Sequence, residues 1–504
     1  MQKPRSFASK RSRPTAWLLS LAALALTLAA CPEPVQEALI AAPDATADLA
    51  SPPDLAPPVD LVPEPDILDL LRRVPGLSVT EKPTSLTDYR FFQLELEQPV
   101  DHARPDGPRF KQRLSLLHRG LRAPVVLHGS GYGASFFSRS GRAELTALLS
   151  ANQIDFEHRY FLPSRPEPAD FRYLTIQQAA ADSHRIVQIF RAIYRGRFLN
   201  TGASKGGMTA VYHRRFFPAD VDATVAYVAP HSLGAPDPRY VPFVNQAGTD
   251  PDCRKRLRDY QRTVLTRRTA VVAALGASGA TFTRLGIDKA LEHSVLELPF
   301  GFWQYRAQAD CAKIPDPAAS DEQVLKFLSD VGSIALYSDQ GIAGFEPYYF
   351  QAASQLGFPA TEEAHLADLL RHPGTDRPDE YLPTELRAGA AYDATAMPDI
   401  SAWLQSDGER ILFIYGSNDP WSAGAFELGL ARDSYRLTVP GGNHGSRVGL
   451  LPEPLRTKAM ALLRRWADVS EPAPQPLAPA LSDEELRLQG LWAGEAGARR
   501  ERPL

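Results

Sequence analysis

Cysteine is scarce in this chain, whose 504 residues include only Cys31, Cys253 and Cys311. So few cysteines exclude a fold that is held together by several disulfides. Cys253 and Cys311 lie far from the N-terminus. In an exported protein we expect them to form one bridge, and two separate buried thiols are the alternative.

Motifs for metals and nucleotides are also missing. The His-Glu-x-x-His pattern does not occur, and His102, His158, His231 and His293 show no pairing typical of a metal site. The glycine-rich run 128–133 has neither the spacing of a dinucleotide fingerprint nor the Lys-Ser/Thr pair of a phosphate-binding loop. The sequence therefore implies no metal and no cofactor.

Acidic residues are absent from the first thirty positions, which carry five cations. The net charge is −4 for the whole chain and about −9 without that segment. Because nucleic-acid binding needs a basic surface, we do not expect the protein to bind nucleic acid.

The N-terminus is typical of export. Its cations precede an apolar run over residues 16–30, which indicates a signal peptide rather than a membrane-spanning helix. Small residues directly before Cys31 resemble the lipobox of bacterial lipoproteins, in which the cysteine is acylated and becomes the new N-terminus. We expect an exported lipoprotein, anchored at the periplasmic or the cell surface or released from it. An ordinary exported protein with a chance Cys31 is the alternative.

Short apolar strands alternate with helices from about Asp66 onward. Strands are expected over residues 90–98, 110–118, 125–127, 153–156, 198–203, 223–228, 410–415 and 435–439. A helix is expected after Thr175, which could form a capping box with Gln178. This alternation predicts a mostly parallel sheet with helices on both faces.

The alternation stops after about residue 232, and the chain is then mainly helix-like until about residue 400, for example over 254–275 and 321–328. We interpret this stretch as a cap inserted between two sheet strands. The predicted organisation is a signal peptide (1–30), a tether rich in Pro, Ala and Asp (31–65), a core in two parts (66–232 and 401–468), a helical cap (233–400) and a C-terminal tail (469–504).

The run Gly202-Ala203-Ser204-Lys205-Gly206 has the Gly-x-Ser-x-Gly form of a nucleophile elbow, in which a strained turn between strand and helix exposes the serine hydroxyl. Small residues also cluster in ordinary turns, so the pattern alone is weak evidence. It gains weight because Asp419 and His444 each follow a later predicted strand, in the chain order that an α/β-hydrolase requires.

These residue types predict nucleophilic catalysis. Ser204 would attack, His444 would accept its proton, and Asp419 would orient the imidazole. The backbone N–H groups of Lys205 and Gly131 would bind the oxyanion. Taken singly, Asp419 could be a turn residue and His444 a loop residue satisfied by backbone.

A collinear set of motifs over about residues 82–466 resembles the secreted bacterial tripeptidyl aminopeptidase family of serine peptidases. The segments are 98–102, 110–113, Glu157-His158-Arg159-Tyr160, 178–182, 202–207, 416–422 and 443–445. The chain is also distantly similar to prolyl carboxypeptidase and dipeptidyl peptidase II. The resemblance implies an α/β-hydrolase fold with an inserted helical cap, and the triad Ser204, Asp419 and His444. It implies an exopeptidase that removes short peptides, chiefly tripeptides and often after proline, from free N-termini of peptide substrates.

An N-terminal ammonium needs a carboxylate at a fixed distance from the nucleophile. Glu157 and Glu346 are our candidates, and a structural ion pair with Arg159 or another cation is the alternative for Glu157. In the related peptidases an acidic residue stands at the place of Gln355. Trp303, Tyr349 and Trp421 are candidates for a proline pocket, although such aromatic residues are often plain core.

Two other functions compete with the exopeptidase. An esterase or lipase would use the same triad, because a fold does not fix its substrate. A lipid-anchored binding protein with an inactive hydrolase fold is the second alternative.

Overall fold

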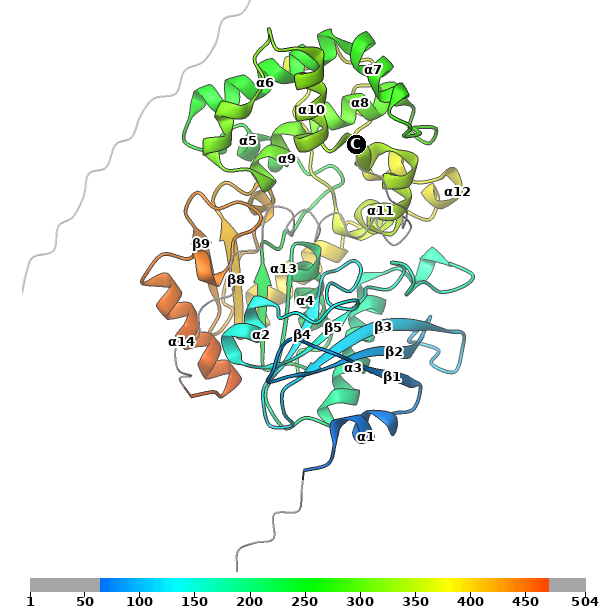
Figure 1. Cartoon of the computed structure of the whole chain (residues 1–504), viewed down its shortest axis with the longest axis vertical. Helices are drawn as coiled ribbons and strands as arrows, with labels where there is room; N and C mark the ends of the chain where they lie inside the picture. The colour runs from blue at the N-terminus through cyan, green and yellow to red at the C-terminus, as the bar shows by residue number, and fades with distance from the viewer. Residues whose placement is uncertain (1–63, 471–504) are drawn as a thin grey trace, which may run out of the picture. The chain divides into compact units, whose positions relative to one another are not determined.

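A nine-stranded sheet forms the frame of residues 64–470, which are the part of the chain that the computed structural model describes (Figure 1). The strands are β1 (Leu77–Lys82), β2 (Arg90–Pro99), β3 (Arg109–His118), β4 (Val125–Gly129), β5 (Asn152–Phe156), β6 (Phe198–Ala203), β7 (Ala223–Tyr227), β8 (Ile411–Gly416) and β9 (Tyr435–Val439). Their order is β1-β2-β3-β5-β4-β6-β7-β8-β9. The pairs β1–β2, β2–β3 and β3–β5 are antiparallel. The remaining pairs, from β5–β4 to β8–β9, are parallel.

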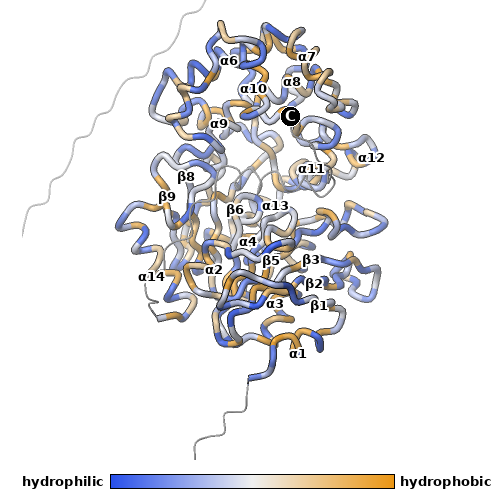
Figure 2. The backbone as a smooth tube through the Cα atoms, in the orientation of Figure 1, coloured by the Kyte–Doolittle hydropathy of each residue, from blue (hydrophilic) through white to orange (hydrophobic). Residues whose placement is uncertain are grey.

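Helices cover both faces of this sheet, so its central strands are buried along nearly their whole length. Side chains alternate between the faces: Val126 packs in one cluster and its neighbour Leu127 in another. One face carries α3 (Ile176–Arg191), α4 (Lys205–Phe216) and α13 (Ala396–Asp407), and the other carries α2 (Glu144–Leu149) and α14 (Leu455–Ala467). A short helix, α1 (Ile67–Arg72), packs at the β1 end, where the tube in Figure 2 is largely apolar.

Between β7 and β8 the chain leaves the sheet and forms a mainly helical cap with its own apolar cluster. Its α-helices are α5 (Tyr240–Val244), α6 (Pro251–Thr266), α7 (Arg268–Ala277), α8 (Ile287–Leu296), α9 (Leu298–Tyr305), α10 (Asp321–Val331), α11 (Asp339–Gln351) and α12 (Thr384–Arg387). In Figure 1 these helices gather beyond one end of β8. The arrangement confirms the predicted α/β-hydrolase fold with a mostly parallel sheet and an inserted cap.

Three local details differ from expectation. The helix expected over 254–275 is two helices, because Arg267 between α6 and α7 has φ −91° and ψ 18°. The core resumes before residue 400, since α13 packs on α4 through the apolar cluster that includes Met397. At α3 the Thr175 hydroxyl accepts from the Gln178 amide, but the Gln178 side chain binds outside the helix, so the capping box is half formed.

Cys253 in α6 and Cys311 in the short 3-10 helix η2 (Gln308–Lys313) form a disulfide, with their Cα atoms 5.3 Å apart. The bridge closes a loop across 58 residues and ties the outer helices of the cap together. Among residues 64–470, no helix is both long and apolar enough to cross a bilayer.

We expect Cys311→Ser to lower the free energy of unfolding by about 4 kcal/mol, the loop-closure value for a bridge of this span. Urea denaturation followed by circular dichroism measures the change. Cys253→Ser and the double variant should give the same loss, because either substitution already removes the bridge. A full additional loss in the double variant would contradict this account.

Candidate active site

Ser204 lies in the sharp turn between β6 and α4, where its backbone has φ 55° and ψ −126°. A residue with a Cβ adopts a positive φ only when the surrounding structure imposes it. The turn also brings strand and helix very close: a Cβ at Gly206 would lie 2.0 Å from the Gly129 carbonyl oxygen. The sequence therefore forms the strained strand-to-helix turn that the Gly-x-Ser-x-Gly pattern predicts.

The glycine-rich loop after β4 lies directly against the amino end of α4. A Cβ at Gly131, which has φ 81°, would lie 2.7 Å from the Gly206 amide nitrogen. The Lys205 ammonium donates to the Gly131 carbonyl at 2.6 Å and lies over the rings of Tyr132 and Phe161. Burial lowers the pKa of this amine well below its usual value. The Lys205 side chain thus holds the loop beside the helix N-terminus, where the helix dipole favours negative charge.

Asp419 and His444 follow β8 and β9 and meet at the same edge of the sheet. The His444 Nδ1 and Asp419 Oδ2 atoms are 2.8 Å apart, and the Asp419 side chain is fully buried. The second ring nitrogen of His444, Nε2, is buried and has no hydrogen-bond partner among the described residues. The cap also fixes this loop, because the His444 amide donates to the Gln304 carbonyl at 3.0 Å.

A second histidine–carboxylate pair lies nearby. His128 Nδ1 is 2.7 Å from Asp155 Oδ1, and the other Asp155 oxygen accepts from the Phe136 amide at 2.8 Å. Asp155 therefore also anchors the loop after β4. Sequence reasoning did not identify this pair.

Ser204 and His444 line one cavity of about 220 Å³ between the core and the cap. The core also contributes Trp421 to the cavity, and the cap contributes Tyr305, Tyr337 and Tyr349. The serine and the imidazole therefore line the same cavity, and aromatic residues of the cap form part of its wall.

Two of the three aromatic candidates line this cavity. Tyr349 stacks on Tyr381 with ring centroids 4.4 Å apart, and Trp421 packs edge-to-face on Phe300 at 5.0 Å. Trp303 does not line it: the ring is fully buried in the cap core. Trp303 therefore has the plain core role.

Glu157 does not line the cavity either. Its carboxylate accepts from the Ser164 hydroxyl at 2.6 Å and from the Ser164 amide at 3.1 Å. Burial raises the pKa of Glu157 to about 7. Arg159 is not the partner of Glu157, because its guanidinium binds Asp182 and backbone carbonyls. Glu157 is thus a buried acid that holds the turn containing Ser164.

Glu346 in α11 lies outside the cavity lining as well. Two guanidinium groups approach its carboxylate, Arg284 at 3.1 Å and Arg165 at 3.6 Å. A carboxylate already paired with two cations is a poor site for a substrate ammonium. Gln355 has a local role, since its Oε1 atom accepts from the Ile176 amide at 2.9 Å.

Sequence reasoning missed Glu297, which lines the cavity, and its buried neighbour Asp376. Burial and the nearby Asp376 charge raise the pKa of Glu297 well above its usual value. Burial also raises the pKa of Asp376, to about 6. One signal in the sequence was available: Glu297 is a lone acid in the apolar run Val295-Leu296-Glu297-Leu298-Pro299. Asp376 lies in a polar loop and gave none.

Within residues 64–470 there is no cluster of three or more His, Cys, Asp or Glu side chains that could hold a metal ion.

A family model described as PS-10 peptidase S37 matches residues 63–482. A prolyl tri/tetrapeptidyl aminopeptidase from Streptomyces mobaraensis is 42% identical over 431 residues, covering 82% of this chain and 89% of the relative. Prolyl carboxy peptidase like protein 5 from Caenorhabditis elegans is 28% identical over 203 residues, covering 36% of this chain and 40% of the relative.

Among solved structures, a proline iminopeptidase from Mycobacterium smegmatis aligns with a TM-score of 0.33 and 14% identity, covering 77% of this chain and 99% of the other. The peroxisomal α/β-hydrolase Lpx1 from Saccharomyces cerevisiae aligns with a TM-score of 0.35 and 10% identity, covering 82% and 99%.

Proposed function

The chain belongs to the PS-10 peptidase S37 family, and from this premise we propose that it is a serine exopeptidase that releases short peptides, chiefly tripeptides and often after proline, from free N-termini. One observation carries the proposal. The carboxylate-bound imidazole of His444 presents a buried, unpartnered Nε2 atom in the cavity that Ser204 also lines.

We propose the following steps for these residues. His444 Nε2 takes the proton of the Ser204 hydroxyl while the oxygen attacks the scissile carbonyl carbon. The tetrahedral oxyanion is bound by the backbone N–H groups of Lys205 and Gly131, each worth roughly 3 kcal/mol in known cases. His444 then gives the proton to the departing amine, which leaves an acyl-enzyme. A water molecule, deprotonated by His444, hydrolyses the acyl-enzyme and restores Ser204.

The cap supports selection of short, unfolded substrates. A cavity of about 220 Å³ under the cap admits an extended peptide end and excludes a folded domain. Tyr349 and Trp421 provide apolar walls for a proline ring.

A free tripeptidyl amide ending in proline should be cleaved at least about tenfold faster, in kcat/KM, than its N-acetylated form, because acetylation removes a charged hydrogen-bond partner. Fluorogenic amides with free and blocked N-termini measure the ratio. A short-chain ester assayed beside them tests the esterase alternative. Equal rates for free and blocked peptides would exclude an exopeptidase, and turnover of the ester alone would favour an esterase.

We also propose that Cys31 is acylated and that the segment up to about residue 65 tethers the enzyme to a membrane at the periplasmic or the cell surface. Residues 1–63 lie outside the described part, so the support is the sequence: an apolar run that ends in small residues before Cys31. Mass spectrometry of the mature N-terminus should find a lipid-modified Cys31. An unmodified N-terminus beyond Cys31 would overturn the proposal.

A further inference from the structure

Glu297 and Asp376 form an unusual pair of carboxyl groups in the cap. Glu297 lies where α8 passes into α9, and Asp376 lies just before the 3-10 helix η6 (Pro378–Tyr381). A hydrogen bond between the two carboxyl groups raises the pKa of Glu297 and lowers the pKa of Asp376, so the two groups are close neighbours. Within the described residues, neither has a lysine or arginine at ion-pair distance.

Other buried acids of the cap differ in this respect. Glu292 is bound by Arg268 at 2.6 Å, and Glu346 by Arg284 at 3.1 Å. Buried carboxylates are normally paired in this way, because an isolated charge is costly to remove from water. The Glu297–Asp376 pair therefore lacks the cation that its neighbours have.

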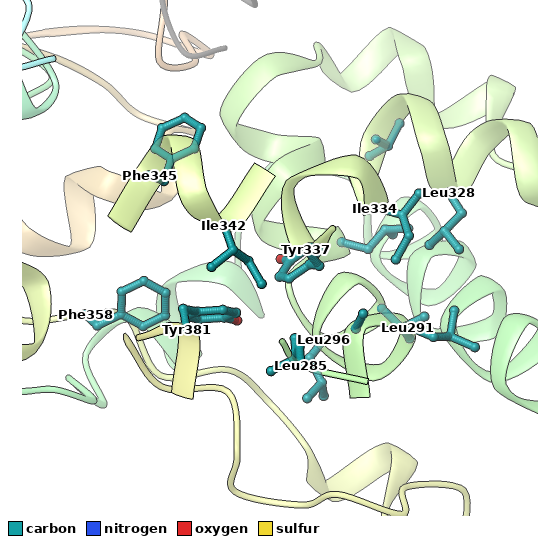
Figure 3. Packing of buried hydrophobic residues seen from close by; sticks show 14 of the residues in the cluster. Leu285, Leu291, Leu296, Leu328, Ile334, Tyr337, Ile342, Phe345, Phe358 and Tyr381 are labelled. Carbon is teal, nitrogen blue, oxygen red and sulfur yellow. The ribbon is translucent and has the colours of Figure 1, made fainter. Parts of the chain in front are cut away.

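The nearest basic side chain does not supply that cation. His293 Nδ1 lies 3.9 Å from Asp376, but burial lowers the pKa of His293 to about 3, so the ring is neutral at physiological pH. Its Nδ1 atom is instead 2.9 Å from the Tyr381 hydroxyl, which donates to Asp376 Oδ1 at 2.7 Å. Tyr337 and Tyr381, whose ring centroids are 6.1 Å apart, lie near each other in the apolar cluster of the cap (Figure 3).

One oxygen atom of the pair lacks a well-aligned donor. Asp376 Oδ2 is buried and has no hydrogen-bond partner of normal geometry among the described residues, and the Asp376 side chain is about 1% exposed. The nearby Thr361 hydroxyl and Glu297 carboxyl group lower the pKa of Asp376, against the larger effect of burial. Two neighbouring carboxyl groups need a proton or a cation between them, since both are acceptors when ionised. The pair is thus an open site for a positively charged donor.

The pair also opens onto the proposed catalytic cavity. Glu297 lines the cavity together with Ser204, and it is the one Asp or Glu among the described lining residues. Tyr337 and Tyr349, whose pKa values the Glu297 charge helps to raise, line the same part of the cap. A cationic group that enters the cavity therefore meets a single acidic position.

We propose that Glu297, backed by Asp376, binds the α-ammonium of the substrate N-terminus and so restricts the enzyme to free peptide ends. This inference rests on the proposed exopeptidase function. An ammonium has three donors, which suit two carboxylates, and it would replace the proton that the empty pair holds. The fixed position of the pair would then determine how many residues lie between the N-terminus and Ser204.

The test compares kcat/KM for a free and an N-acetylated tripeptidyl amide in Glu297→Gln, Asp376→Asn and Glu346→Gln. Glu297→Gln should lower kcat/KM for the free substrate by about tenfold to a hundredfold, chiefly through KM, and leave the acetylated substrate nearly unchanged. Asp376→Asn should act in the same direction. Glu346→Gln is the matched control, a carboxylate of the same cap outside the cavity, and it should keep the wild-type ratio.

A second readout is the pH profile of the ratio between kcat/KM for the free substrate and kcat/KM for the acetylated substrate, in which pH effects on the shared catalytic steps cancel. Acidification through about pH 6 protonates Asp376 and should lower the ratio, because a neutral pair attracts the ammonium less. Alkaline pH should lower the ratio again, because the substrate amine, with a pKa of about 8, loses its proton. Groups around the pair that titrate or carry charge are Tyr337, Tyr348, Tyr349, Tyr381, His293, Lys289 and Glu363. In Glu297→Gln the acid limb should flatten.

Fluorophosphonate labelling of Ser204 distinguishes a failure of the proposed amine site from a failure of the proposed exopeptidase function. Folded Glu297→Gln that labels at the wild-type rate but loses the preference for a free N-terminus supports the site. A variant that labels normally and keeps the preference overturns the site and leaves the exopeptidase intact. If the wild type itself shows no preference, the proposed function fails. Should Glu297→Gln not fold, Asp376→Asn and the pH profile of the wild type decide in the same way.

Discussion

Replacing Ser204 with alanine should lower kcat for a free tripeptidyl amide by about 10⁶, the loss seen when a serine triad loses its nucleophile. Without the hydroxyl no acyl-enzyme forms, and the unpartnered Nε2 of His444 has no proton to accept. Steady-state assays with the fluorogenic substrate measure the loss, and thermal unfolding verifies that the variant is folded.

Ser135 supplies a matched control, because it is a second serine that lines the same cavity. Ser135→Ala should stay within about tenfold of the wild type, since the nucleophile Ser204 and its base His444 are both intact in this variant. If Ser204→Ala kept activity, or Ser135→Ala lost as much, Ser204 would not be the nucleophile.

Asp419→Asn should lower kcat by about 10⁴ with little change in KM, as the corresponding substitution does in a serine triad. An amide in place of the buried carboxylate can donate to Nδ1, which favours the tautomer whose Nε2 atom carries the proton. That tautomer cannot act as a base. Stopped or continuous assays across pH 6 to 9 would measure kcat and KM separately.

The second histidine–carboxylate pair, His128 and Asp155, provides a control for the Asp419→Asn prediction. Asp155→Asn should cost less than Asp419→Asn, because Asp155 is expected to act through the loop that carries Gly131. A larger loss in Asp155→Asn would assign the base to His128 and contradict the proposed roles of Asp419 and His444.

The sheet could be predicted because its signals are local. The apolar runs before Ser204, Asp419 and His444 are too short for helices, and each one leads into a turn rich in small residues. Strands of a parallel sheet that are buried on both faces are typically apolar, so β8 stands out in the sequence. The position of a residue directly after such a strand also predicts which sheet edge it reaches.

The cap could not be predicted to the same depth. Its helices are held by contacts between segments that are far apart in the sequence, such as the Cys253–Cys311 bridge. Whether an acid there binds substrate depends on the cations near it, and these come from other elements: Arg284 and Arg165 neutralise Glu346. Glu297 lacks such partners, and only the packing of the cap shows it.

Glu157 illustrates the same limit in the core. Its place after β5 was predicted, but its partner, Ser164, lies beyond a turn whose course the sequence does not indicate. The carboxylate therefore points to a structural contact and away from the cavity.

The most direct measurement is mass spectrometry of a peptide library with free and acetylated N-termini, incubated with the wild type and with Ser204→Ala. The account predicts that the wild type releases short N-terminal peptides, chiefly tripeptides, from the free peptides alone, and that Ser204→Ala releases none. Cleavage within acetylated peptides, or release that persists in Ser204→Ala, would contradict it.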